Sequence, residues 1–148
     1  MRLRRSHVVH GFGQLVERGV AVDLVFGRVE DTTVEDWNRV LGTNVIGPDL
    51  CVKHAVPEFK KAGGGAIVTI GSISSFIAQA DYVPYNTSKS ALINMTRCLA
   101  MDLAPFKIRA NVVCPGFVRT PLVEKQIPEQ AKELGISEAE VIKTVMLK

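Results

Sequence analysis

The spacing of apolar and polar residues alternates along the chain between short apolar runs, typical of strands, and longer periodic stretches, typical of helices. Apolar runs at residues 20–26, 66–70 and 108–114 predict three strands. The run at 66–70 is apolar at almost every position, as expected for a strand that is covered on both faces. Turn residues bound these runs: glycines at 63–65 precede the second, and Pro115-Gly116 ends the third.

A long helix is predicted between the first two strands. Thr32 and Glu35 have the spacing of an N-terminal capping box, and the helix is expected to continue to about residue 61. Gly47-Pro48 predicts a bend, because proline has no N–H to bond the carbonyl of Asn44. The sequence leaves two interpretations of that freed carbonyl open: a site for a bound water, or the result of a simple helix break.

Three further helices are predicted after residue 83. Pro84 suits the first turn of a helix that extends to about residue 103, where Pro105 ends it. Short helices are expected at 121–132 and 137–147, the second with Ser137 and Glu140 as a capping box. In the long helix four residues recur at helical spacing and predict a core stripe: Leu92, Met95, Leu99 and Leu103.

The alternation of strands and helices predicts an α/β fold with a parallel sheet. Ligands of such sheets bind at the carboxyl ends of the strands. Ser72 and Pro115-Gly116 both follow predicted strands, so this edge is the expected functional site. The length of 148 residues fits one domain, 1–148, in which residues 1–19 show no defined element.

The composition disfavours several function classes. With 47% hydrophobic and 22% charged residues the chain is an ordinary globular domain, and a net charge of +3 gives no electrostatic reason to expect a nucleic-acid partner. No apolar run approaches the roughly 20 residues of a membrane span. Arg2, Arg4 and Arg5 form a basic tip that fits a solvated terminus or a mitochondrial presequence. The tip lacks the aromatic interleaving of a nucleic-acid site.

The cysteines and histidines predict no metal site and no disulfide. Cys51, Cys98 and Cys114 are odd in number and widely spaced, and the three histidines lack the spacing of zinc ligands. We therefore expect reduced, buried thiols in a cytoplasmic protein or one of the mitochondrial matrix.

Tyr85 and Lys89 carry the strongest indication of chemistry. They are four residues apart in a predicted helix, so the ammonium is expected beside the phenol on one face. A neighbouring cation favours the phenolate form and so suits a tyrosine to acid–base work. Ser72, thirteen residues before Tyr85, is expected to point its hydroxyl from a strand end toward this helix. Taken alone, the pair is also compatible with an ordinary solvated helix start.

Five ordered motifs at fitting separations resemble those of the short-chain dehydrogenase/reductase family. They are Thr33-x-Glu35-x-Trp37, Asn44-Val45-x-Gly47, residues 65–72, Tyr85-Asn86-Thr87-Ser88-Lys89, and residues 111–121 with their Pro-Gly-Phe-Val-Arg-Thr core. The resemblance extends from about residue 20 to at least residue 126. It implies a partial Rossmann-like, doubly wound parallel sheet. It also implies reversible hydride transfer between NAD or NADP and a secondary alcohol or ketone.

The resemblance also implies roles for individual residues. Tyr85 would be the catalytic acid/base, and Lys89 would support it and hold the nicotinamide ribose. Ser72 would hydrogen-bond the substrate carbonyl, and Asn44 would hold a water that links Lys89 to solvent. The nicotinamide end of the cofactor would contact Pro115, Gly116, Val118 and Thr120.

Residues 122–132 resemble the lid of bacterial-type 3-hydroxybutyrate dehydrogenases, in which a glutamine matching Gln126 helps to bind the substrate carboxylate. Ser74 and Tyr82 stand where those enzymes have a histidine and a lysine. Loss of a cation weakens carboxylate binding, because charge-assisted hydrogen bonds are the stronger ones. The resemblance thus implies 3-hydroxybutyrate, or a neutral alcohol or ketone, held by Ser74, Tyr82, Phe117 and Gln126. A solvated helix position is the other interpretation of Gln126.

The chain also departs from the family pattern. Gly11 and Gly13 follow too little apolar sequence to form the glycine-rich phosphate loop, and Phe26-Gly27-Arg28-Val29 replaces the expected Asn-Asn-Ala-Gly. The N-terminal nucleotide-binding strands and the last strand of the family are missing. We therefore expect about three strands with flanking helices, in an incomplete catalytic domain whose sheet has two open edges.

Open edges and uncovered apolar faces predict association between chains. In the family the two long helices, here after residues 32 and 84, form the subunit interface, so a homo-oligomer is expected. Two hypotheses about function follow: an oxidoreductase acting on a small molecule, or a catalytically impaired fragment that acts only by associating with a full-length relative. No membrane or nucleic-acid partner is expected.

Overall fold

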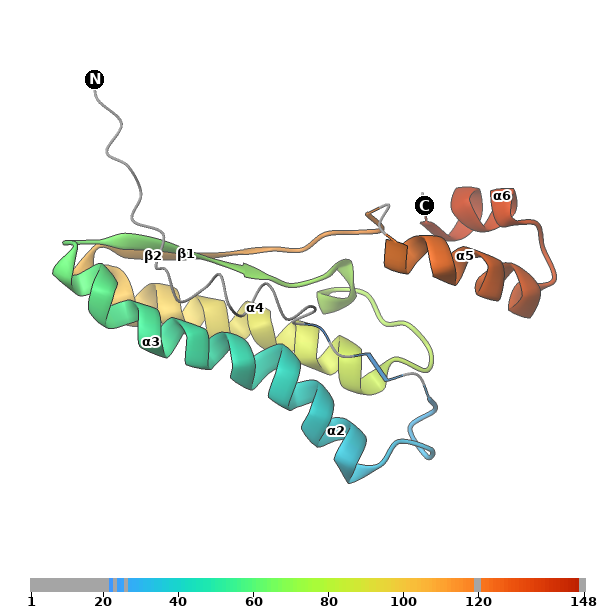
Figure 1. Ribbon diagram of the computed structural model, residues 1–148, viewed down its shortest axis with the longest axis horizontal. Coiled ribbons are helices and arrows are strands. Elements are labelled where there is room, and N and C mark those ends of the chain that lie inside the picture. The colour runs from blue at the N-terminus through green and yellow to red at the C-terminus, as the bar shows by residue number, and fades with distance from the viewer. Residues whose placement is uncertain (1–21, 23, 26, 119–120, 147–148) are drawn as a thin grey trace, which may run out of the picture. The chain divides into compact units, whose positions relative to one another are not determined.

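The computed structural model describes residues 22, 24–25, 27–118 and 121–146. The chain divides into two compact units, Met1–Val113 and Cys114–Lys148. In order, the elements of the first unit are α2 (Val34–Leu41), a π-helical turn (Gly42–Ile46), α3 (Gly47–Lys61), β1 (Gly65–Ile70), a 3-10 helix (Ile73–Ser75), α4 (Val83–Leu103), a second 3-10 helix (Ala104–Phe106) and β2 (Ile108–Val113) (Figure 1). This order confirms the strands predicted at 66–70 and 108–114 and the helix predicted at 84–103.

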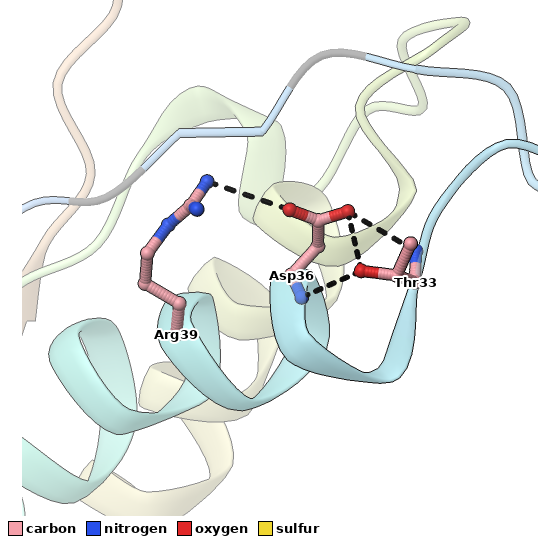
Figure 2. Close-up of polar contacts among 3 residues, drawn as sticks. All are labelled: Thr33, Asp36 and Arg39. Atoms are coloured by element: carbon pink, nitrogen blue, oxygen red, sulfur yellow. Dashed lines mark hydrogen bonds and ion pairs between the residues drawn. The ribbon is translucent and has the colours of Figure 1, made fainter.

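A capping box starts α2, as Figure 2 shows, but one residue later than predicted. Thr33 Oγ1 accepts from the backbone N–H of Asp36 at 3.1 Å, and Asp36 Oδ2 accepts from the backbone N–H of Thr33 at 3.1 Å. The expected pairing of Thr32 with Glu35 is therefore wrong. The Thr32 hydroxyl donates instead to the carbonyl of Val29 at 3.2 Å, which commits it to the preceding turn.

The long helix changes its geometry just before Pro48, as Gly47-Pro48 predicted. Residues Gly42–Ile46 form a π-helical turn, in which the N–H of Gly47 bonds the carbonyl of Gly42 five residues back. The α-helix resumes with Pro48 in its first turn, where a missing N–H is tolerated. On this turn Asn44 is turned inward and is only 1% exposed.

The two strands β1 and β2 pair in parallel, as the alternation of elements predicted. Their register runs from Gly65 opposite Ile108 to Ile70 opposite Val113. The glycine turn before β1 is also confirmed: Gly64 has a φ of +145°, and a Cβ on it would lie 2.8 Å from the carbonyl oxygen of Lys107. Only glycine combines that backbone conformation with so close an approach.

The third predicted strand, at residues 20–26, is not formed by the described part of that run. Residues 22, 24 and 25 have no strand pairing, and the remainder of the run lies outside the described residues. Gly27 makes a single parallel bridge to Tyr82, and one bridge does not make a ladder. Among the described residues the sheet thus has two strands instead of about three.

Helices α3 and α4 lie together on one side of the sheet (Figure 1). Val52 on α3, Ile67 on β1, Ile108 on β2 and Leu103 on α4 form the core cluster between them. The predicted stripe on α4 is confirmed: Leu92 and Leu103 are buried, and Met95 and Leu99 are half-buried.

The other face of the sheet is open. Val68 and Ile70 on β1 are 58% and 56% exposed, and Val113 on β2 is 50% exposed. The expectation that residues 66–70 are covered on both faces is therefore wrong, because α3 and α4 both pack against the same face. The expectation that apolar faces stay uncovered is confirmed.

The three cysteines are free, but they are less buried than expected. Cys51 and Cys114 are half-buried and Cys98 is exposed. Cys98 is exposed because it lies off the stripe that Leu92 and Leu103 form on α4.

The second unit contains α5 (Pro121–Leu134), α6 (Glu138–Val141) and a closing π-helical turn (Ile142–Met146). Among the residues of this unit that the structure describes, Ile127 and Val141 are buried. The predicted capping box is confirmed: the N–H of Glu140 donates to Ser137 Oγ at 3.2 Å, and the N–H of Ser137 donates to Glu140 Oε2 at 3.0 Å. Within the described ranges, no helix of either unit has the length and apolar character needed to cross a membrane.

Candidate functional site

Tyr85 and Lys89 lie on the same side of α4, near its N-terminus. The Lys89 ammonium is 5.7 Å from the centroid of the Tyr85 ring. The spacing of the two residues predicted this juxtaposition, and the helix from Val83 provides it. Pro84 starts the helix in its first turn, so the phenol and the ammonium belong to its first two turns.

The Lys89 side chain is only 3% exposed and is anchored to the sheet. Its Nζ donates to the carbonyl oxygen of Ile70, the last residue of β1, at 3.2 Å. The backbone carbonyl of Lys89 in turn accepts from Ser75 Oγ at 2.8 Å. A buried ammonium requires a hydrogen-bond acceptor, and the Ile70 carbonyl holds it at the carboxyl end of a strand.

Ser72 follows β1 after a single glycine and is buried. Its Oγ accepts from the N–H of Ser74 at 3.1 Å and so caps the 3-10 helix Ile73–Ser75, which packs against α4. Gly71 N–H bonds the carbonyl of Val113 at 2.8 Å, which holds this loop to the end of β2. Since Ser72 accepts in its cap, its own hydroxyl hydrogen remains a donor for another acceptor.

The loop between β1 and α4 brings Ser74 and Tyr82 into the same region. Ser74 Oγ donates to Gln79 Oε1 at 2.5 Å, and the carbonyl of Gln79 accepts from Asn86 Nδ2 at 3.4 Å. The ring of Tyr82 lies edge-to-face with that of Tyr85, with centroids 6.4 Å apart. The loop is therefore tied to the first turn of α4 that carries the phenol.

Asn44 reaches α4 from the π-helical turn. Its Nδ2 donates to Ser88 Oγ at 3.0 Å, and Ser88 Oγ donates to the carbonyl of Tyr85 at 2.7 Å. The role of Asn44 in holding a water stays a prediction.

The remaining predicted residues belong to the second unit. Pro115, Gly116, Phe117 and Val118 precede α5, and Gln126 lies on α5. Thr120 lies outside the described residues. That these residues meet a cofactor or substrate held by Tyr85 and Lys89 stays a prediction.

Four side chains take part in this arrangement without a predicted role: Ser75, Gln79, Asn86 and Ser88. Ser75 and Gln79 lie in a connection without periodicity, and no motif distinguishes them. For Ser88 a signal existed, because a serine three residues after Tyr85 can bond back to that residue's carbonyl. Its bond with Asn44, 44 residues away, had no counterpart in the sequence pattern.

The arrangement offers a phenol, a cation close to it and a serine hydroxyl at one strand end. This set can move a proton to or from an oxygen atom and stabilise the charge that results. In the part of the chain that the structure describes, no group of three or more His, Cys, Asp or Glu side chains could hold a metal ion.

Comparison with known proteins finds relatives over most of the chain. A family model described as Enoyl-(Acyl carrier protein) reductase matches residues 10–145. A D-beta-hydroxybutyrate dehydrogenase from Rhizobium meliloti (strain 1021) is 39% identical over 121 residues, which cover 82% of this chain and 47% of that protein. The chain spans about half the length of the curated relatives it matches.

Two solved structures illustrate the similarity of fold. A short chain dehydrogenase family protein from Francisella tularensis subsp. tularensis SCHU S4 matches with a TM-score of 0.71 and 38% identity, over 82% of this chain and 49% of that one. ElxO with NADP bound matches with a TM-score of 0.69 and 27% identity, over 80% and 52% of the two chains. These structures confirm the predicted fold class, a partial Rossmann-like α/β sheet.

Proposed function

The chain belongs to the short-chain dehydrogenase/reductase family, and from this premise we propose that it serves hydride transfer between NAD or NADP and a secondary alcohol or ketone. One observation carries the proposal. The Lys89 ammonium, held 3.2 Å from the Ile70 carbonyl oxygen at the end of β1, lies 5.7 Å from the centroid of the Tyr85 ring. When bound, the nicotinamide supplies or accepts the hydride.

Tyr85 handles the proton. In alcohol oxidation its phenolate takes the hydroxyl proton while the carbinol carbon gives up its hydride. In ketone reduction its phenol returns that proton to the carbonyl oxygen. The Lys89 ammonium is buried close to the Tyr85 ring and offers a fixed positive charge beside the reacting oxygen atoms.

Ser72 and Asn44 complete the proton chemistry. The Ser72 Oγ already accepts a hydrogen bond from the N–H of Ser74. Its own hydrogen is left to donate to the substrate oxygen. Asn44 holds a water through its backbone carbonyl and connects Lys89 with solvent through that water. The hydrogen bond from its side chain to Ser88 keeps Asn44 close to the start of α4.

The donors at this strand end fit the nicotinamide half of the cofactor. An ammonium and a phenol suit the neighbouring hydroxyls of a ribose, so Tyr85 and Lys89 would hold that sugar. The proposed contacts to the carboxamide are Val118 and Thr120, and Pro115 and Gly116 are further proposed contacts to the cofactor. The NADP bound in ElxO supports a nicotinamide dinucleotide, and the proposal includes both NAD and NADP.

The proposed substrate is 3-hydroxybutyrate or a related hydroxyacid, with a neutral alcohol or ketone as the second choice. The relative from Rhizobium meliloti supports the first. The pairing of Ser74 with Gln79 supports the second, because it offers neutral hydrogen-bonding groups and no cation for a carboxylate. Ser74, Tyr82, Phe117 and Gln126 are the proposed contacts.

We also propose a homo-oligomer that forms through the two long helices. Apolar side chains exposed on them support this: Ile46 and Leu50 lie along the π-helical turn and α3, and Met101 lies on α4. Sedimentation velocity of the full chain is expected to show a species larger than a monomer. A monodisperse monomer would contradict the proposal.

A reducing compartment, the cytoplasm or the mitochondrial matrix, is the proposed location. The support is that Cys51, Cys98 and Cys114 are all free thiols. Alkylation of protein isolated without reductant, followed by mass spectrometry, is expected to label all three.

The decisive experiment compares wild type with Tyr85→Phe in a nicotinamide absorbance assay over a panel of hydroxyacids and ketones. Tyr85→Phe removes one oxygen and is expected to lower kcat by at least about 100-fold, since general acid–base catalysis contributes about 10²–10⁴. Tyr82→Phe removes the only other phenol of the chain and is the matched control, expected to change KM more than kcat. Equal turnover of wild type and Tyr85→Phe would refute the proposed chemistry. Association with a full-length relative without turnover would favour the impaired-fragment hypothesis.

A further inference from the structure

Ser88 is completely buried on α4, between the two residues that carry the proposed chemistry. It has an exposed fraction of 0%, and its partner Asn44, on the π-helical turn, is almost equally buried. Two polar side chains from segments 44 residues apart therefore meet in the interior. Burial of such groups is unfavourable unless they are hydrogen-bonded, so the pair demands a definite geometry.

The direction of the hydrogen bonds follows from the atoms. Asn44 Nδ2 can only donate, so Ser88 Oγ accepts this bond at 3.0 Å. The hydrogen of the Ser88 hydroxyl then goes to the carbonyl of Tyr85 at 2.7 Å. The result is a one-way chain from the amide of Asn44, through the hydroxyl of Ser88, to the backbone of the residue that carries the phenol.

These two hydrogen bonds connect the π-helical turn to the first turns of α4. The Lys89 carbonyl is bonded by Ser75 from the side of the sheet at 2.8 Å, so the backbones of Tyr85 and Lys89 are each held by a serine hydroxyl. The two contacts come from different neighbours of α4: Ser88 relays one from the π-helical turn, and Ser75 lies in the 3-10 helix after β1. Both connect the backbone at the start of α4 to segments outside this helix.

We propose that Ser88 is a positioning residue that couples the π-helical turn to the orientation of the Tyr85 phenol. Without its hydroxyl the amide of Asn44 no longer holds the Tyr85 backbone, and the phenol loses its fixed position beside the Lys89 ammonium. The inference rests on the proposed function for its catalytic consequence, but the geometric consequence can be measured without turnover.

The same helix provides a matched control in Thr96. Thr96 is buried and donates its hydroxyl to the carbonyl of Leu92 at 2.7 Å, and its Oγ1 shares a hydrogen bond with Thr69 Oγ1 of β1 at 2.6 Å. It therefore resembles Ser88, as a buried hydroxyl that bonds back along α4 and also bonds a side chain of another element. It lies seven residues beyond Lys89, about two helical turns farther along α4.

The experiment follows the NMR resonance of the Tyr85 ring in isotope-labelled full-length protein, assigned with Tyr82→Phe. Ser88→Ala and Asn44→Ala are each expected to move this resonance, and the double variant to move it no further than the larger single change, because both break one chain. Thr96→Ala is expected to leave it in place. Thermal unfolding of each variant, measured alongside, separates loss of fold from loss of position.

Ser88→Cys keeps a weak donor and acceptor at nearly the same size and is expected to restore part of the wild-type resonance. In the nicotinamide assay, Ser88→Ala is expected to lower kcat by about 10-fold or more with little change in KM. A resonance that stays in place in Ser88→Ala, or that moves equally in Thr96→Ala, overturns the inference. Absence of turnover in wild type refutes the proposed function instead, and the resonance still decides the role of Ser88.

Discussion

The two faces of the β1–β2 sheet are built from similarly apolar residues but have different surroundings. On one face Ile67 and Ile108 pack against α3 and α4 and are almost fully buried. On the other face Val68, Ile70 and Val113 are at least half exposed. Alternate residues of a strand point to opposite faces, so one backbone serves both environments. The covered face is thus the one that stabilises the unit, whereas the open face leaves apolar side chains exposed.

The largest expected effect comes from truncation on the covered face. Ile108→Ala is expected to lower the free energy of unfolding by about 2–5 kcal/mol, because a buried isoleucine loses contacts and leaves a cavity. Val68→Ala, on the open face, is expected to lower it by less than about 1 kcal/mol. Urea denaturation of both variants measures the difference. Equal losses would show that the open face is covered in solution.

A substitution at the start of β1 tests how tightly the covered layer is packed. A Cβ on Gly65 would overlap the ring of Phe59 on α3, so Gly65→Ala is expected to destabilise by about 1–3 kcal/mol. Gly42→Ala is the control, since a Cβ there meets nothing within 4 Å and the backbone is right-handed helical. Its stability is expected to stay level or to rise by up to about 1 kcal/mol. A neutral Gly65→Ala would mean that α3 moves freely over the strand.

Loss of the N-terminal cap of α2 tests how much this cap stabilises the first unit. Thr33→Ala removes the acceptor for the N–H of Asp36 at the start of α2 and is expected to cost about 1 kcal/mol. Thr32→Ala, which removes only the bond to Val29, is expected to cost less. Denaturation midpoints of the two variants distinguish them. A larger effect for Thr32→Ala would restore the capping box that the sequence first indicated.

The smallest effect is expected from a decrease in pH, which should weaken one helix cap in each unit. The bond from the backbone N–H of Thr33, the bond from its hydroxyl and the charge of Arg39 lower the pKa of Asp36 below its ordinary value of 3.8. Bonds from the backbone N–H and hydroxyl of Ser137 likewise lower the pKa of Glu140 below 4.5.

Because both folded-state pKa values are lowered, these carboxylates contribute stability above their ordinary values. The contribution is lost as pH falls through the lowered values. Helical circular dichroism against pH measures it, with Asp36→Asn and Glu140→Gln as variants. A wild-type acid transition that both variants leave unchanged would contradict the assignment.

The elements with strong periodicity were predictable from the sequence. The strands β1 and β2 and the helix α4 have strong apolar patterns, and these elements form where the patterns predict them. The capping box was displaced by one residue because Thr32 and Thr33 offer the same spacing to Glu35 and Asp36. Only the competing bond from Thr32 to a carbonyl three residues back decides between them.

The candidate site was predictable only where it is local in sequence. Tyr85 and Lys89 are joined by one helical turn, so their spacing implied their contact. The contact of Asn44 with Ser88 depends on a π-helical turn. Gly47-Pro48 predicted a change in the helix at this place, but not that the change would be a π-helical turn. The cover of Val68 and Ile70 was overestimated because an apolar pattern indicates that cover is favourable, not that it is provided.

The register of the sheet has a consequence for how the chain folds. Each residue of β1 pairs with one 43 positions later, from Gly65 with Ile108 onward. During synthesis on the ribosome β1 therefore emerges before β2, which is its only pairing partner among the described residues. Pairing over so long a separation is slow, and an unpaired apolar strand is prone to aggregate. The interval between the two strands is thus the stage at which the backbone of β1 is most open to pairing with other chains.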